Sequence, residues 1–257
     1  MQVMPVLESL FRWMHVVAGI LWIGLLYFFN FVNAGFAATL DAEAKKKVVP
    51  ELMPRALHWF RHGAAWTWVT GVLLLAMVFY HGGVVWEDPA AGWGAGAFAM
   101  VALTFLGPFV YDGLMRSLGK SNVKAAYAVA FLILAAIVYL FDRWAGFGYR
   151  GMVIHTGTML GSTMAFNVWF RIWPSQRKII RAIKDGQAPD PAWVALAGSR
   201  SRQNTYMSVP LVWMMLNAHT TWASTGSFAW LYLLAAILLG WWVTSMLLRH
   251  APKIKGF

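Results

Sequence analysis

The chain contains no cysteine among its 257 residues. Disulfide bonds and thiolate metal sites are therefore excluded, and so is a covalently attached c-type haem, which needs a C-x-x-C-H motif. Charged residues are scarce as well, at 12% of the chain, which is about half the share found in a soluble domain. Because 60% of the residues are hydrophobic, the composition is that of an integral membrane protein.

Acidic residues are also few, at 10 against 21 lysines and arginines, which gives a net charge of +11. In a membrane protein such an excess indicates basic cytoplasmic loops and contact with anionic lipid headgroups. We therefore expect membrane lipids as partners, and no nucleic acid. The N-terminal stretch MQVMPVLESL lacks a basic region and a small-residue cleavage site. We expect the first apolar segment to be a retained span and not a signal peptide.

Long apolar runs fill most of the sequence, without the period-two alternation of a membrane β-barrel. A spanning helix needs about 20 mostly apolar residues. We predict an all-α fold, a polytopic membrane helix bundle with about seven transmembrane helices, as a single integral membrane domain over residues 1–257. The predicted spans cover residues 9–34, 64–81, 94–115, 123–141, 151–173, 206–222 and 228–248.

Basic residues gather in alternate connections between these spans. The first, third and fifth connections and the C-terminal tail together hold 18 of the 21 lysines and arginines. Because positively charged loops stay on the cytoplasmic side, we predict a periplasmic N-terminus and a cytoplasmic C-terminus. Two of the cytoplasmic connections, DAEAKKKVVPELMPRAL and SQRKIIRAIKDGQ, predict short amphipathic helices on the membrane, with Gly186 ending the second. These helices face headgroups or, as an alternative, dock a partner.

Histidines inside apolar spans are functional candidates, because imidazole is costly to bury in hydrocarbon without a partner. His15, His155 and His219 lie on three different predicted spans, each within roughly 10 Å of the outer boundary. Neutral imidazole is a common axial ligand of haem iron, so the three are our candidates for a non-covalent haem b. Arg12, one turn outward of His15, is placed to meet a propionate. Met159 is a packing residue or a sixth ligand.

The stretch HTGTMLGSTMAFN around His155 is rich in small residues. It would let a flat porphyrin approach the helix backbone, or it marks close packing between helices. His58 and His62 share a helix face and are half of a metal site, ligands of a second haem, or an interfacial pair beside Arg61. We expect Asp112, the only acidic residue well inside a predicted span, to pair with Arg116 one turn later. Asn167 needs a partner or a ligand.

Five stretches of the sequence resemble the membrane domain of the bacterial cytochrome c-linked urate hydroxylases, or membrane urate oxidases. They occur in the family's order and together cover almost the whole chain: RWMHVVAGILWIG, ALHWFRHGAAWTWVTGVLLL, FVYDGLMRSLG, IHTGTMLGSTMAFNVWFRIWPSQRKIIRAIKDGQAPDP and SRQNTYMSVPLVWMMLNAH. The residues that match the family's motifs are His15, His58, Tyr111, Asp112, Arg116, His155, Asn167, Asn204 and His219.

The resemblance implies a multi-pass oxidoreductase of the bacterial inner membrane that oxidises urate or a related purine. In the family an eighth span leads to a periplasmic cytochrome c domain, and this sequence ends at Phe257 without either. We therefore expect a separate cytochrome c or a multisubunit electron-transfer complex as the partner. The alternatives are a non-catalytic haem-binding electron-transfer or anchor subunit of a respiratory or photosynthetic complex, and a transporter or structural subunit without a cofactor. The number of haems is left open.

Overall fold

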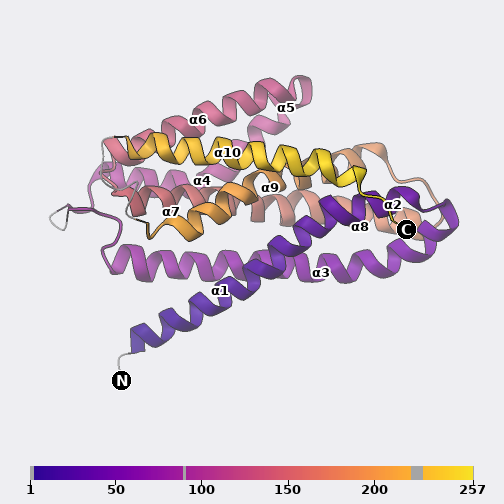
Figure 1. Ribbon diagram of the computed structural model, residues 1–257, viewed down its shortest axis with the longest axis horizontal. Coiled ribbons are helices and arrows are strands. Elements are labelled where there is room, and N and C mark those ends of the chain that lie inside the picture. The colour runs from indigo at the N-terminus through magenta and orange to yellow at the C-terminus, as the bar shows by residue number, and fades with distance from the viewer. Residues whose placement is uncertain (1–2, 89–90, 221–227, 257) are drawn as a thin grey trace. The chain divides into compact units, whose positions relative to one another are not determined.

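The computed structural model describes residues 3–88, 91–220 and 228–256, and within them the chain is helical with no strand (Figure 1). The predicted all-α fold is therefore confirmed. The α-helices are α1 (Val3–Tyr27), α2 (Ala34–Thr39), α3 (Ala42–Leu74), α4 (Ala95–Arg116), α5 (Leu118–Ser121), α6 (Val123–Arg143), α7 (Tyr149–Asn167), α8 (Trp173–Lys184), α9 (Pro191–Asn217) and α10 (Ala229–His250). The π-helical segments are η1 (Phe28–Asn33), η2 (Leu75–His81) and η3 (Val168–Ile172), and a final 3₁₀ turn is η4 (Ala251–Lys253).

Among the described residues, five helical stretches are long and apolar enough to cross a membrane, which makes this a multi-pass membrane protein. They cover Val3–Thr39, Ala42–His81, Ala95–Ser121, Val123–Arg143 and Ala229–Lys253. The predicted spans 151–173 and 206–222 fall on α7 with η3 and on α9, which carry more polar residues, and residues 221–222 lie outside the described part. Several of these polar side chains are buried, among them Thr156, Asn167 and Asn204. The count of seven spans stays a prediction.

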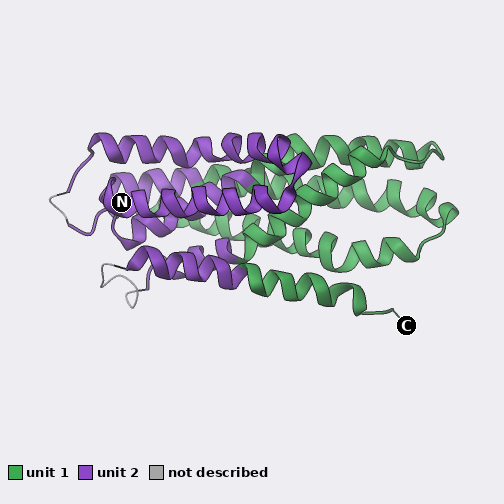
Figure 2. Cartoon of the chain, turned by 90° about the horizontal axis from the view of Figure 1, so that it is seen from above, with its two compact units in different colours: residues 1–71, 164–209, 241–257 green, residues 72–163, 210–240 purple. Residues whose placement is uncertain are grey.

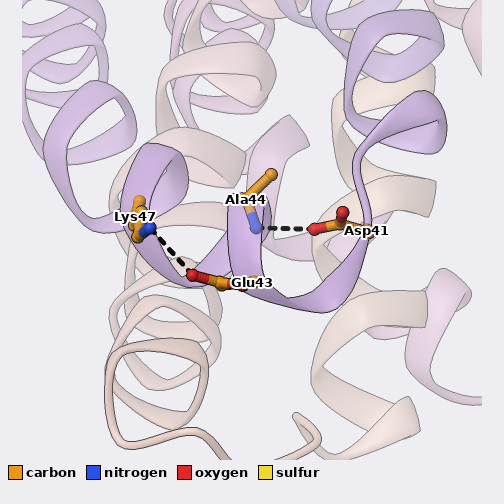
Figure 3. A network of polar contacts seen from close by, with 4 residues as sticks. All are labelled: Asp41, Glu43, Ala44 and Lys47. Atoms are coloured by element: carbon orange, nitrogen blue, oxygen red, sulfur yellow. Dashed lines mark hydrogen bonds and ion pairs between the residues drawn. The ribbon is translucent and has the colours of Figure 1, made fainter.

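The sequence predicts a separate short helix in the basic connection after the first span, and this prediction is wrong. It forms the first turns of α3, which is continuous through Pro50 and Pro54. Asp41 caps this helix by accepting a hydrogen bond from the backbone N–H of Ala44 at 2.7 Å, and Lys47 forms an ion pair with Glu43 at 2.8 Å (Figure 3). Capping satisfies a backbone donor that the helix itself leaves unpaired.

The second basic connection forms α8, an amphipathic helix as predicted. Ile179 and Ile180 are buried, whereas Arg177 and Lys178 are exposed. The helix ends at Lys184, and Gly186 follows with φ of +72°. Because L-residues with a side chain rarely adopt this left-handed conformation, the predicted stop at Gly186 is confirmed.

The chain divides into two compact units (Figure 2). Unit 1 comprises residues 1–71, 164–209 and 241–257, and unit 2 comprises residues 72–163 and 210–240. In unit 1, polar side chains join α1 and η1 to α9: Ser208 donates to the hydroxyl of Tyr27 at 3.1 Å, and Asn30 donates to Ser201 at 2.9 Å. Such bonds between helices satisfy polar groups that lipid cannot satisfy. The single membrane domain stays a prediction.

In unit 2, the small residues of α7 pack against side chains of neighbouring helices. A Cβ atom built on Gly157 would lie 2.8 Å from Cε of Met215 on α9. Met159 lies against Gly107 of α4, where a Cβ atom would be 2.8 Å from its sulfur. At these positions the small-residue stretch serves helix packing, and Met159 is a packing residue.

The predicted orientation is testable by reporter fusions. A fusion after Lys255 should report the cytoplasm and a fusion within the 82–93 connection should report the periplasm, because the positively charged connections resist translocation. Paired alkaline phosphatase and green fluorescent protein fusions at each position measure this. The reverse pair of results would overturn both the topology and the depth assigned to the histidines.

Candidate functional site

His155 of α7 lies in an aromatic cage within unit 2, with 0% of the residue exposed. Its ring centroid is 4.5 Å from that of Phe147, 5.6 Å from that of Phe141 and 5.6 Å from that of Tyr80. Three separate parts of the chain supply these rings: η2, α6 and the α6–α7 connection. Trp93 extends the cage, with its ring 5.2 Å from Tyr80. The cage excludes water from the imidazole.

Both ring nitrogens of His155 are engaged, and their partners fix the tautomer. Nδ1 lies 2.6 Å from the carbonyl oxygen of Gly151, one turn earlier on α7. A carbonyl only accepts, so Nδ1 carries the proton, and in the neutral ring Nε2 accepts a hydrogen bond from the Tyr80 hydroxyl at 3.0 Å. The lone pair that a metal would use is therefore held by a phenol, and a ligand at Nε2 must displace Tyr80.

His219, in the same unit, has the opposite arrangement. A guanidinium nitrogen of Arg150 lies 2.7 Å from Nδ1 of His219, and the same side chain donates to the carbonyl of Ala218 at 3.2 Å. Because a guanidinium only donates, Nδ1 is the acceptor, and Nε2 of the neutral ring carries the proton. Arg150 at the start of α7 thus forms hydrogen bonds with the two residues that follow α9.

His15 lies in unit 1, half-buried between α1 and α3. Its Nδ1 donates to the carbonyl oxygen of Thr67 at 2.9 Å and lies 3.2 Å from the hydroxyl of Thr70. The lone pair of the neutral ring is consequently on Nε2. About one turn earlier on α1, Arg12 forms an ion pair with Glu8 at 2.6 Å, with half of its side chain exposed.

His58 and His62 lie in unit 1 on one face of α3, as the sequence predicts. Their ring centroids are 4.2 Å apart, and Nδ1 of His62 donates to the carbonyl of His58 at 2.7 Å. The guanidinium of the neighbouring Arg61 covers the ring of Trp173, 4.1 Å from its centroid. His81 is exposed at the end of η2.

The remaining predicted residues are polar and mostly buried. Asn167 is fully buried and donates to Oδ1 of Asn204 at 2.9 Å, and Asn204 in turn donates to the carbonyl of Met164. Oδ1 of Asn167 has no hydrogen-bond partner among the described residues. Asp112 is 5% exposed and Arg116 is exposed, and their pairing stays a prediction.

Comparison with known protein families identifies the family of this chain. Residues 40–255, most of the chain, match the family model described as "Urate oxidase N-terminal". The chain belongs to the urate oxidase N-terminal family. The resemblance to this family is thereby confirmed; four of the five sequence stretches lie within the matched residues, and the first, residues 12–24, precedes them. Comparison with curated proteins and with solved structures found no match.

The donor set of this urate oxidase family member fits a haem iron better than a bare metal ion. Among the described residues, no group of three or more His, Asp or Glu side chains is placed to hold a metal ion. Porphyrin nitrogens supply four ligands of a haem iron, so one or two imidazoles suffice. His15 and His155 each donate Nδ1–H to a backbone carbonyl, which is the orientation typical of metal-bound histidine.

Sequence reasoning missed Tyr80, which contacts His155 across 75 positions of the chain. Tyr80 lies in the π-helical segment η2, and π-helical turns occur frequently at functional sites. Asn204 was among the residues that match the family's motifs, but it was not identified as the partner of Asn167, and Arg150 was not identified as the partner of His219.

Proposed function

We propose that the protein is a haem-b-binding membrane oxidoreductase that oxidises urate or a related purine and passes the electrons to a cytochrome c. The match to the urate oxidase N-terminal family supports the oxidation of urate or a related purine. The observation that carries the haem is His155, a fully buried imidazole whose Nδ1–H is held by a backbone carbonyl, so that Nε2 is the ligating atom.

These contacts support two histidines as the residues that would hold the haem. In unit 2, His155 would hold the haem iron through Nε2 once the Tyr80 hydroxyl leaves that atom, and the carbonyl of Gly151 orients the ring. His15 is the corresponding candidate in unit 1, with Arg12 available to a propionate if it leaves Glu8. Attachment is non-covalent because the chain has no cysteine. Bound haem supplies one-electron transfer.

The substrate class is supported by an unsatisfied polar group in unit 1. Oδ1 of Asn167 is a buried acceptor without a partner, and leaving such a group unpaired costs about 1–3 kcal/mol. Urate and related purines carry ring N–H donors of the kind this oxygen accepts. In a hydroxylation of urate, water supplies the oxygen, and two electrons and two protons leave the substrate. Cytochrome c accepts the electrons.

The test is urate-dependent reduction of oxidised cytochrome c by the purified, haem-loaded protein under anaerobic conditions. We expect reduction at 550 nm with a ratio near two cytochromes per urate consumed, as the electron balance requires. Omitting urate or the protein should leave the cytochrome oxidised. If the haem-loaded protein exchanges electrons with cytochrome c but never consumes urate, the oxidase proposal fails and an electron-transfer subunit remains.

A further inference from the structure

A groove between α1 and α3 in unit 1 has no place in the proposed function. Its volume is about 460 Å³, within the range of small-molecule sites. Its walls are apolar apart from two imidazoles. The lining residues are Trp13, Met14, Val17, Ala18, Leu21, His58, Trp59, His62, Gly63 and Trp66.

The groove opens on a surface that suits lipid and not water. Both helices belong to candidate membrane spans. Trp13 is 66% exposed, Trp59 58% and Trp66 54%, so indole rings border the opening. The basic residues in the first turns of α3 place its start at the headgroups, and His62 lies seven residues beyond Arg55, about 10 Å deeper. A ligand in this groove comes from the bilayer.

Two imidazoles, those of His58 and His62, are among the residues that line the groove, and they carry hydrogen-bonding nitrogens that hydrocarbon cannot satisfy. Because Nδ1 of His62 donates to the carbonyl of His58, Nε2 of the neutral His62 ring is an acceptor. The His58 ring, 4.2 Å away, supplies a further donor or acceptor. Polar groups at a membrane-facing surface are costly without partners, so the occupant should carry hydrogen-bonding groups.

We propose that this groove binds the headgroup of an isoprenoid quinone or quinol. A flat ring stacks on the indoles, the ring oxygens meet His58 and His62, and the isoprenoid chain leaves through the open side into the bilayer. A lipid acyl chain in the groove would leave the imidazoles without hydrogen-bond partners. A charged purine would have to move from water to a groove with apolar walls. The inference is independent of urate oxidation and gives the protein access to the membrane quinone pool.

The test measures quinone binding in lipid nanodiscs, with decylubiquinone as the probe and quenching of tryptophan fluorescence as the readout. Quenching should have a saturable component above the linear one caused by partitioning into lipid. Val17→Phe should abolish the saturable binding because the larger ring fills the groove from an exposed position. His62→Leu should weaken it by about tenfold because it removes one hydrogen bond to the headgroup.

Two control variants match these. Val16→Phe changes the adjacent exposed residue, which does not line the groove, and His81→Leu removes an exposed histidine elsewhere; both should bind like wild type. Saturable binding that survives Val17→Phe and His62→Leu would overturn the proposal. Loss of the haem absorption in His62→Leu would also overturn it, because the groove would then hold a porphyrin. A change of oligomeric state in Val17→Phe would overturn it as well, because the groove would then bind a second copy of the chain.

Discussion

Replacing His155 with alanine should remove bound haem, lowering the haem-to-protein ratio by at least about tenfold. The imidazole is fully buried in its cage of Phe141, Phe147 and Tyr80 and is held by the carbonyl of Gly151. Alanine therefore leaves an apolar space without a ligand for iron. The Soret absorbance per mole of protein measures this, and acidic acetone should extract the pigment from wild type because no thioether bond can form.

The companion variant Tyr80→Phe separates ligation from packing. It removes the hydroxyl that occupies Nε2 of His155 and keeps the ring that packs beside Trp93. The haem-free protein should lose about 1 kcal/mol of stability, the usual worth of one hydrogen bond, while haem affinity stays equal or rises. His81→Ala, next along the chain, should bind haem like wild type. If His155→Ala keeps its full haem content, another residue must be the iron ligand, and His15 and His58 are the next residues to test.

The sequence predicts most of the helices because hydropathy is a local property. Apolar runs of about 20 residues mark α4, α6 and α10 without knowledge of their neighbours. The stop after α8 is equally local, since it depends on the backbone freedom of Gly186. Sequence reasoning was wrong about the start of α3: it predicted a separate short helix there, whereas α3 continues through Pro50 and Pro54 into the apolar segment.

The partners of the buried polar groups are not predictable in the same way. Asn167 was expected to need a partner, but the choice of Asn204 depends on how α7 packs on α9, 37 positions away. The tautomers of His155 and His219 differ for the same reason: one ring meets a carbonyl and the other a guanidinium. From the sequence, the two histidines have the same predicted depth in the membrane and are equivalent ligand candidates. Their contacts in the structure place the proton on different ring nitrogens.

The site depends on Gly151 as much as on the histidine, and Gly151→Ala should damage both the fold and haem binding. The Val85 carbonyl oxygen, which accepts the N–H of Gly148 at 2.9 Å, lies directly against Gly151. An added Cβ would overlap that oxygen and would sit 3.2 Å from Cβ of Phe147, so backbone must move. Overpacking of this kind costs about 1–3 kcal/mol of stability.

The shift reaches His155, because the carbonyl of Gly151 holds its Nδ1–H. We expect a lower unfolding temperature and a haem affinity reduced by about 10–100-fold, the usual effect of disturbing a residue that orients a ligand. The matched control is Gly113→Ala in α4, where no atom lies within 4 Å of the added Cβ. That variant should keep its haem and gain about 0.5–1 kcal/mol, since alanine favours the helix. Equal unfolding temperatures and haem contents for the two variants would show that the connection carrying Val85 yields freely and does not hold the histidine in place.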